Sequence, residues 1–247
     1  MVFTKNEKLR YHRQIIMADV GLEGQMKLRE AKVLVVGAGG LGSPLLYYLA
    51  AMGIGNIGIA DPEEVDLSNL QRQILYTIND IGKSKAKAAK DRLKKLNPDV
   101  KIEIFPFYLN EINSEEIIVS YDIIVASVDN ISTRYFVNDT CIKLGKPFVE
   151  AGVSGWEGMI MTVLPGKTPC YRCVIPAQIK GEQNKELGVI GCLAGILGTM
   201  QAMEVVKLIL GKGNNLQGRL VVFNGYDMSF EEVQIAKNPK CKICGKL

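Results

Sequence analysis

Histidine is almost absent from this sequence: His12 is the one histidine in 247 residues. Many hydride-transfer sites use a histidine as their general acid or base. His12 lies in the N-terminal arm, so the histidine that such a site normally uses is missing. This absence argues against a dehydrogenase.

A strong charge of either sign is also missing. The 30 Lys and Arg residues nearly balance the 26 Asp and Glu residues, which leaves a formal net charge of +4. The sequence contains neither a basic tail nor an alternation of aromatic and basic residues. We therefore expect no direct binding to DNA.

Long hydrophobic runs are the third absence. The N-terminus, MVFTKNEKLRYHRQ, is charged, and no secretory signal is visible in it. The most apolar stretch, LGVIGCLAGILGTM (187–200), is short and rich in glycine for a membrane span. Because Gln201 and Glu204 follow it, we expect a buried helix there, and a cytoplasmic protein.

Apolar strands alternate with helices over the first 150 residues. Hydrophobic residues make up 47% of the chain, which is enough to fill a sizeable core. The pattern predicts strands at 33–36, 56–61, 101–109, 121–130 and 147–153, and helices at 43–53, 84–98 and 133–145. This alternation predicts an α/β protein with a doubly wound, mostly parallel, Rossmann-like sheet.

The pattern changes at about residue 151. The segments 158–166 and 218–224 resemble strands, but they lack the intervening crossovers that connect parallel strands. This pattern predicts an antiparallel C-terminal extension. The polar, glycine-bearing segment 176–192 is a candidate mobile loop. We expect one domain over 1–247, made of an N-terminal helical arm (1–30), a nucleotide-binding core (31–150) and the extension (151–247).

The motif GAGGLG (37–42) follows a predicted strand and precedes a predicted helix. Gly37, Gly39 and Gly42 fit the spacing of a phosphate-binding turn, where a helix N-terminus favours a phosphate group. Asp61 ends the next strand, where a carboxylate would bind ribose hydroxyls. The alternative is a tight turn without a ligand. By themselves these features favour NAD.

Three features favour ATP over NAD. The catalytic histidine is missing, and no separate substrate domain follows. Four polar residues lie near the carboxyl ends of parallel strands or in the connections leaving them: Asn69, Arg72, Lys85 and Asp129. A doubly wound sheet binds its ligand at that edge. A guanidinium and an ammonium neutralise phosphate charge. A carboxylate such as Asp129 can hold Mg²⁺.

Each of these residues also has an ordinary structural interpretation. Lys85 belongs to the basic run KSKAKAAK, in which most lysines solvate a helix face. Asp129 or Asn130 could cap the helix that follows. Arg72 could be a surface charge in a polar loop. Their joint placement at one edge of the sheet favours a site for ATP and Mg²⁺.

Four of the six cysteines form two C-x-x-C pairs, CYRC and CKIC. In a reducing compartment such pairs indicate a metal site more than disulfides. Cys170, Cys173, Cys241 and Cys244 together supply the four thiolates of a structural Zn²⁺ site with no open coordination position. The remaining two, Cys141 and Cys192, are predicted to be buried core residues.

The motifs RYHRQ (10–14), GAGGLGS, DLSNLQRQ, GKSKA, VDN, CYRC, GTMQAMEVVK and CKIC occur in this order. With them the chain resembles the ThiF/MoeB/HesA family of ubiquitin-activating-enzyme-like adenylyltransferases. The resemblance implies adenylation of the C-terminal Gly-Gly carboxylate of a small β-grasp, ubiquitin-like sulfur carrier, with MgATP as substrate and pyrophosphate as product. The pathway would be that of molybdopterin, thiamine or tRNA thiolation, with a sulfur donor such as a cysteine desulfurase or a rhodanese.

The resemblance also implies a role for individual residues. Gly40 would lie in the phosphate-proximal turn, and Asp61 would bind the ribose. The nucleotide would be lined by Ser68, Asn69, Leu70, Gln71 and Arg72, with Lys85 contacting ATP and Asp129, next to Asn130, binding Mg²⁺. Arg13 would enter the ATP site of the partner subunit in a homodimer. The carrier carboxylate is itself a nucleophile, so this chemistry needs no histidine base.

Many members of this family carry a further cysteine, used in thioester, persulfide or disulfide chemistry. Asn184 occupies roughly that position here, so covalent sulfur transfer by this chain is not predicted. Three other functions remain open. They are activation of another carboxylate (a modified tRNA nucleoside or a peptide), a nucleotide-binding scaffold that docks a carrier without chemistry, and an NAD enzyme.

Overall fold

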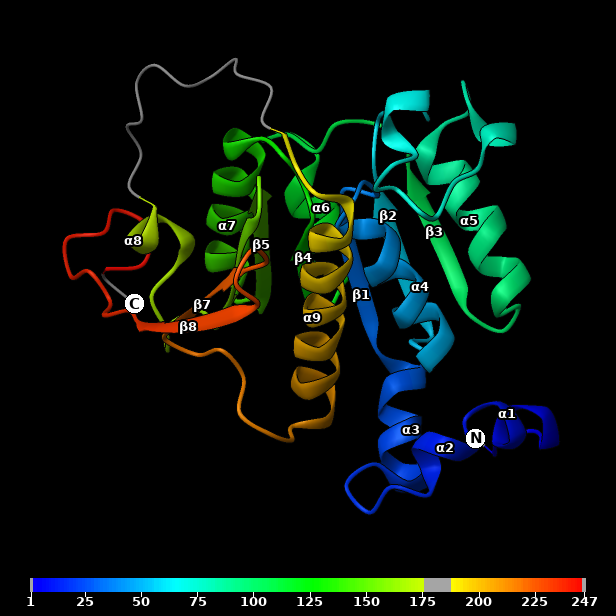
Figure 1. Cartoon of the computed structure of the whole chain (residues 1–247). Coiled ribbons are helices and arrows are strands. Elements are labelled where there is room, and N and C mark those ends of the chain that lie inside the picture. Colours follow the sequence, from blue (N-terminus) through cyan, green and yellow to red (C-terminus); the bar gives the residue numbers. More distant parts are fainter. Residues whose placement is uncertain (1, 176–187, 246–247) are drawn as a thin grey trace.

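The computed structural model describes residues 2–175 and 188–245 (Figure 1). Within these residues the strands form one eight-stranded sheet, in the order β3-β2-β1-β4-β5-β6-β7-β8. The strands are β1 (Lys32–Val36), β2 (Asn56–Ala60), β3 (Lys101–Phe105), β4 (Ile123–Ala126), β5 (Phe148–Ser154), β6 (Glu157–Val163), β7 (Arg219–Asn224) and β8 (Ser229–Gln234).

The five strands from β3 to β5 pair in parallel, and β5, β6, β7 and β8 pair in antiparallel fashion. The predicted fold class, a mostly parallel doubly wound sheet with an antiparallel C-terminal extension, is confirmed. β1 lies between β2 and β4, so the strand order reverses there. Such a reversal is where open α/β sheets bind ligands.

Helices cover both faces of the sheet. The side chains of Val33 and Val35 pack with α4 (Gly42–Met52), α5 (Lys85–Leu96) and α9 (Gly191–Leu210). The alternate residues, Leu34 and Val36, pack on the other face with α6 (Ser114–Ile118) and α7 (Ile131–Leu144). All four strand residues are almost fully buried, which explains why this strand is a continuous apolar run.

The remaining helices are short or lie at the N-terminus. They are α1 (Lys5–Arg10), α2 (His12–Ile15), α3 (Gly21–Glu30), α8 (Tyr171–Val174) and the 3₁₀ helices η1 (Leu67–Asn69) and η2 (Ile78–Asp80). In Figure 1, α3 leads directly into the first end of β1, so α1 and α2 lie beyond that end of the sheet.

Several predicted boundaries differ from the structure. β3 stops at Phe105 because Pro106 follows and cannot donate to a strand ladder. β4 ends at Ala126, so Ser127–Asn130 forms a loop. β8 and α6 were not predicted.

Part of the candidate loop 176–192 is ordered structure. Val189 forms a bridge with Gly155, and α9 already begins at Gly191. Residues 176–187, which include Asn184, lie outside the described residues.

α9 is the one helix in the described residues that is long and apolar enough to cross a membrane by length and composition. One side of it is buried against the molecule, with Leu193, Leu197 and Val205 inside the core. Its buried polar residues, Gln201 and Glu204, both have partners on the sheet. The predicted buried helix is confirmed.

Glu204 ties α9 to the antiparallel extension. Its Oε2 accepts hydrogen bonds from the Thr162 hydroxyl at 2.6 Å and from the Leu216 N–H at 2.9 Å. Lys207, one turn along α9, also pairs with this carboxylate. A carboxylate that is 3% exposed is stable here only because these groups replace water.

We therefore expect Glu204→Ala to lower the free energy of unfolding by about 3 kcal/mol, because it leaves a buried hydroxyl and a buried N–H without an acceptor. Urea denaturation of the two proteins measures the difference. Glu231→Ala, at an exposed position of β8, is the control and should change it by less than about 0.5 kcal/mol. Equal losses in both variants would contradict the assignment.

Candidate active site

The glycine turn after β1 is tightly folded and buried. Gly37 has φ +94°, and a Cβ on Gly42 would lie 2.2 Å from the Gly37 carbonyl oxygen. Both positions therefore require glycine. Asp61, at the end of β2, accepts hydrogen bonds from the N–H of Ala38 (2.7 Å) and of Glu63 (2.9 Å). Burial raises the pKa of the Asp61 carboxyl, and the Ala38 N–H is the main group that opposes the rise.

The DLSNLQRQ segment folds over this turn. Asp66 and Asn69 form a capping box on η1, and the Arg72 Nη1 donates to the Ser68 carbonyl at 3.2 Å. A Cβ on Gly40 would lie 3.3 Å from the Arg72 Cγ, so the Arg72 side chain rests against the turn. Arg72 and Gly40, predicted to share a site, are brought together.

The other residues of this segment differ in exposure. Ser68 and Gln71 are exposed, whereas Leu70 is half-buried and packs against the core. A Cβ on Gly191 would lie 2.3 Å from the Gln71 carbonyl oxygen, so the start of α9 borders the segment.

Lys85 is not a surface lysine. Its side chain is 3% exposed, and its Nζ lies 2.6 Å from Glu63 Oε2. The alternative that Lys85 solvates a helix face is wrong. Glu63, its partner, is 56% exposed, so the ammonium is held at the boundary between the core and solvent. A cation held in this way can accept a different anion when one binds.

The loop after β4 carries Asp129 and Asn130. Ser127 N–H donates to the Val36 carbonyl at 2.8 Å, so this loop begins directly beside the glycine turn. Asn130 caps α7 by accepting from the Thr133 N–H at 2.8 Å, which confirms the capping interpretation for Asn130. Asp129 is exposed and does not supply the cap.

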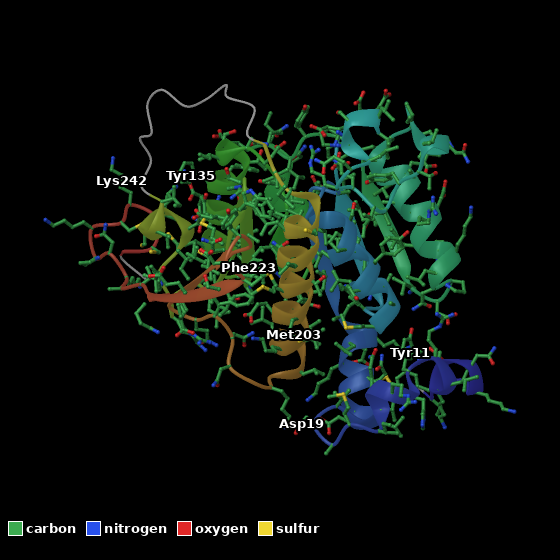
Figure 2. All side chains as sticks on the ribbon, in the orientation of Figure 1. Tyr11, Asp19, Tyr135, Met203, Phe223 and Lys242 are labelled. Carbon is green, nitrogen blue, oxygen red and sulfur yellow. The ribbon has the colours of Figure 1, made fainter. Side chains whose placement is uncertain are left out.

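Arg13 lies at the other end of the sheet. It is exposed on α2, and Figure 2 labels its neighbour Tyr11 among the N-terminal helices, beyond the end of β1 opposite the glycine turn. Tyr11 accepts a hydrogen bond from Asn97 Nδ2 (2.8 Å), and Gln14 donates to Gln25 (2.7 Å). Within one chain, Arg13 is therefore not brought to Asp61, Arg72, Lys85 and Asp129.

The two C-x-x-C pairs meet in space. All four Sγ atoms lie within 4.8 Å of one another, with Cys170–Cys241 at 3.7 Å and Cys173–Cys244 at 3.4 Å. In a four-thiolate zinc site with Zn–S bonds of about 2.3 Å, the sulfur atoms lie about 3.8 Å apart. The residues present fit a tetrahedral metal site.

α7 holds the first of these pairs in place. Asn138 Oδ1 accepts from the Tyr171 N–H at 2.9 Å, and Asp139 receives three hydrogen bonds from Arg172, at 2.7, 3.0 and 2.7 Å. The Arg172 guanidinium also lies 4.3 Å from the ring centroid of Tyr135. The ligand loop is thus positioned by side chains of a long helix, as metal ligands commonly are.

The two remaining cysteines differ. Cys141 is fully buried in α7, as predicted, and burial raises the pKa of its thiol. Cys192 is exposed, so its prediction as a core residue is wrong. The apolar stretch around it is real, but Cys192 lies in the first turn of α9, before the buried face begins at Leu193.

Residues 11–243 match the model of the ThiF family. The chain belongs to the ThiF family. The resemblance inferred from RYHRQ, DLSNLQRQ and the paired cysteines is thereby confirmed. The match begins at Tyr11, which anchors the N-terminal arm, and ends at Ile243, inside the second C-x-x-C motif.

Curated relatives of this ThiF-family chain are named adenylyltransferases. The sulfur carrier protein adenylyltransferase of Thermus thermophilus is 42% identical, over 99% of this chain and 93% of its own length. The probable molybdopterin-synthase adenylyltransferase of Porphyra purpurea is 44% identical, over 98% of this chain and 66% of its own length. The adenylyltransferase and sulfurtransferase MOCS3 of Culex quinquefasciatus is 42% identical over 97% of this chain, which spans 56% of it. The prediction of an adenylyltransferase is confirmed.

Solved structures share the fold. E. coli MccB with ATP has a TM-score of 0.81 at 25% identity, over 90% of this chain and 69% of the MccB chain. PaaA has a TM-score of 0.81 at 27% identity, over 96% of this chain and 76% of the PaaA chain.

Three buried polar residues at the site were not predicted. The Tyr76 hydroxyl donates to the Ala38 carbonyl at 2.8 Å, and Gln201 Nε2 donates to the Ala126 carbonyl at 2.7 Å. Arg134 contacts the loop that carries Asp129. Gln201 lies between Met200 and Ala202 in an apolar helix, and this was its available signal. Arg134, between Thr133 and Tyr135, offered no such signal. Nothing in the sequence around Tyr76 distinguishes it.

For this ThiF-family chain we expect Cys173→Ser to lose the bound metal and to lower the Tm by about 5 °C or more, because metal binding contributes directly to folding. Elemental analysis and thermal denaturation measure the two effects. Cys192→Ser, at an exposed cysteine outside the cluster, should retain the metal and the Tm of the unmodified protein. Undiminished metal in Cys173→Ser would contradict the ligand set.

Proposed function

We propose that this protein adenylates the C-terminal Gly-Gly carboxylate of a small β-grasp, ubiquitin-like sulfur carrier, with ATP as the adenylyl donor and pyrophosphate as the product. The observation that carries the proposal is the placement of Arg72 against the glycine turn and of the buried Lys85 near Asp61, which is bonded to that turn, beside the loop of Asp129. Two cations and two carboxylates at a strand-order reversal suit a nucleoside triphosphate.

Each residue has a defined part in this reaction. Asp61 binds the ribose hydroxyls, and the turn at Gly40 approaches the phosphates. Arg72 and Lys85 neutralise the charge that develops on the leaving pyrophosphate, and Lys85 exchanges the exposed Glu63 for a phosphate oxygen. Ser68, Asn69, Leu70 and Gln71 line the nucleotide beside Arg72. Asp129, with Asn130 next to it, holds the Mg²⁺ that accompanies ATP.

The reaction depends on aligning the carrier carboxylate with the α-phosphorus more than on proton transfer. The carrier carboxylate is ionised at neutral pH and attacks the α-phosphorus directly, so the absence of a histidine other than His12 is no obstacle. Mg²⁺ supplies charge neutralisation on the phosphates when it is bound. The residues of this chain orient the triphosphate.

The relatives support the carrier and the nucleotide. The Thermus thermophilus relative, which matches nearly the whole chain, is named a sulfur carrier protein adenylyltransferase, and MccB was solved with ATP. The pathway is that of molybdopterin, thiamine or tRNA thiolation, and the sulfur is delivered by a separate donor such as a cysteine desulfurase or a rhodanese. The metal of the cysteine cluster is Zn²⁺, in a structural role. We place the protein in the cytoplasm.

The homodimer is the second part of the proposal. Arg13 is exposed at the end of the sheet opposite the glycine turn of its own chain, and Tyr11 and Gln14 anchor the helix that carries it. As the family resemblance implies, we propose that it acts in the ATP site of the partner subunit. In a two-fold dimer each subunit then completes the site of the other.

We expect ATP–pyrophosphate exchange that depends on a carrier ending in Gly-Gly, and we expect Asp129→Ala to reduce it about 100-fold or more, because the metal that neutralises phosphate charge is lost. Radiolabelled pyrophosphate measures the exchange. Asp91→Ala, at an exposed position of α5, is the control and should retain full activity. Full activity in Asp129→Ala would contradict the magnesium assignment.

The same assay separates the alternatives. Exchange without a carrier, supported by a modified tRNA nucleoside or a peptide carboxylate, would identify another substrate. ATP binding without exchange over a panel of carriers would indicate a scaffold. Tighter binding of NADH than of ATP would identify an NAD enzyme.

Subunit mixing tests Arg13. Arg13→Ala and Asp129→Ala should each be inactive alone. After the two are mixed and allowed to exchange subunits, about a quarter of the normal activity should return, because half of the dimers contain one intact site. The measurement is the exchange rate before and after mixing. No recovery would show that Arg13 acts within its own chain, and full activity of Arg13→Ala alone would show that it has no catalytic part. Mixing Arg13→Ala with itself controls for the treatment.

A further inference from the structure

A buried ion pair lies under the loop that carries Asp129. Arg134, in the second turn of α7, points its guanidinium into the molecule, and Glu150 of β5 lies opposite it. Arg134 Nη1 is 2.8 Å from Glu150 Oε1, with side-chain exposures of 9% and 1%. The proposed function assigns no role to either residue.

Stability alone does not explain this pair. Removing two charges from water offsets most of their mutual attraction, and buried ion pairs are often replaceable by apolar residues without loss of stability. Within its strand, Glu150 lies between Val149 and Ala151, which are both fully buried and apolar. Burial raises the pKa of Glu150 to about 7, although the Arg134 guanidinium opposes the rise.

The geometry of Arg134 indicates what the pair does. Its Nε and Nη2 both donate to the Val128 carbonyl, at 3.2 and 2.7 Å, while Nη1 faces Glu150. The Val128 carbonyl and the Asp129 N–H belong to one planar peptide group. Two donors in a rigid fork on that carbonyl therefore fix the orientation of the peptide that leads into Asp129.

β5 also provides space for the guanidinium. A Cβ on Gly152 would lie 2.5 Å from Arg134 Nη1, closer than any side chain can approach. The strand thus supplies the counter-charge at Glu150 and an open position two residues later. From the opposite face of the sheet, Gln201 holds the preceding residues through the Ala126 carbonyl and the Ser127 hydroxyl.

We infer that Arg134, held by Glu150, is a positioning residue that orients the Asp129 loop for binding the divalent cation that accompanies the nucleotide. The inference rests on the proposed function of Asp129. The inference assigns Arg134 no contact with the nucleotide or the metal. It acts through the Val128 carbonyl, so its loss should weaken cation binding more than nucleotide binding.

Arg134→Lys tests this, because an ammonium keeps the positive charge beside Glu150 but cannot reproduce the planar fork on the Val128 carbonyl. Loss of a group that orients a metal ligand typically weakens metal binding about 10- to 100-fold. We expect a shift of that size in the Mn²⁺ dissociation constant, measured by electron paramagnetic resonance with a non-hydrolysable ATP analogue at pH 8. Binding of the analogue in EDTA should remain unchanged.

Arg219→Lys is the matched control. Arg219 also pairs with a carboxylate (Glu232, 2.7 Å) and donates to a carbonyl (Asn215, 2.9 Å), but it lies on β7. It should leave Mn²⁺ binding unchanged. Gly152→Ala is the second variant, because its Cβ displaces the guanidinium without removing it, and it should weaken Mn²⁺ binding in the same direction. The Tm and the metal content of the cysteine cluster confirm that each variant is folded.

Two outcomes would overturn the inference. If the unmodified protein binds Mn²⁺ with the analogue and both Arg134→Lys and Gly152→Ala bind it equally well, the positioning role is wrong and the proposed function stands. If the unmodified protein neither binds the Mn²⁺–analogue pair nor exchanges pyrophosphate, the proposed function fails, and this inference fails with it.

Discussion

The end of β1 and the end of β4 meet with no room for a side chain between them, and the candidate site depends on this contact. A Cβ on Gly37 would lie 2.6 Å from the Ser127 carbonyl oxygen, and Ser127 N–H bonds back to Val36. The glycine turn and the Asp129 loop are therefore one rigid unit. Because α4 and α7 follow this unit on opposite faces of the sheet, the unit lies at the reversal of strand order where open α/β sheets bind their ligands.

The parallel core was predictable because its strands are buried on both faces and so appear as continuous apolar runs. β8 was not, because its sequence SFEEVQ is largely exposed at the edge of the sheet and shows little apolar pattern. At the site, the sequence placed Asp61 directly after β2, Asp129 in the loop after β4, and Arg72 and Lys85 in the connection between β2 and α5. It could not show that Lys85 is buried against Glu63, or that Cys192 is exposed, because both depend on how distant segments pack.

Two residues of the RYHRQ motif anchor the N-terminal arm to the end of α4. Tyr11 packs on Gly53, where a Cβ would lie 2.6 Å from its ring, and Gln14 donates to the Met52 carbonyl at 3.1 Å. Both contacts are made to the last residues of α4, whose first residue is Gly42 of the glycine turn. One helix therefore connects the nucleotide turn at its N-terminus to the anchor of the arm at its C-terminus. Arg13, between the two anchoring residues, remains exposed.

α7 contacts both the Asp129 loop and the cysteine cluster. Its first turns carry the Asn130 cap and Arg134, which orients the Val128 peptide, and later turns carry Asn138 and Asp139, which hold the CYRC pair. The Tyr171 side chain also interacts with the Arg134 guanidinium. The cysteine cluster thus sets the place of Tyr171, and Tyr171 lies against the arginine that supports the Asp129 loop. The four cysteines and the Asp129 loop are thus connected through α7, because side chains of this one helix contact both.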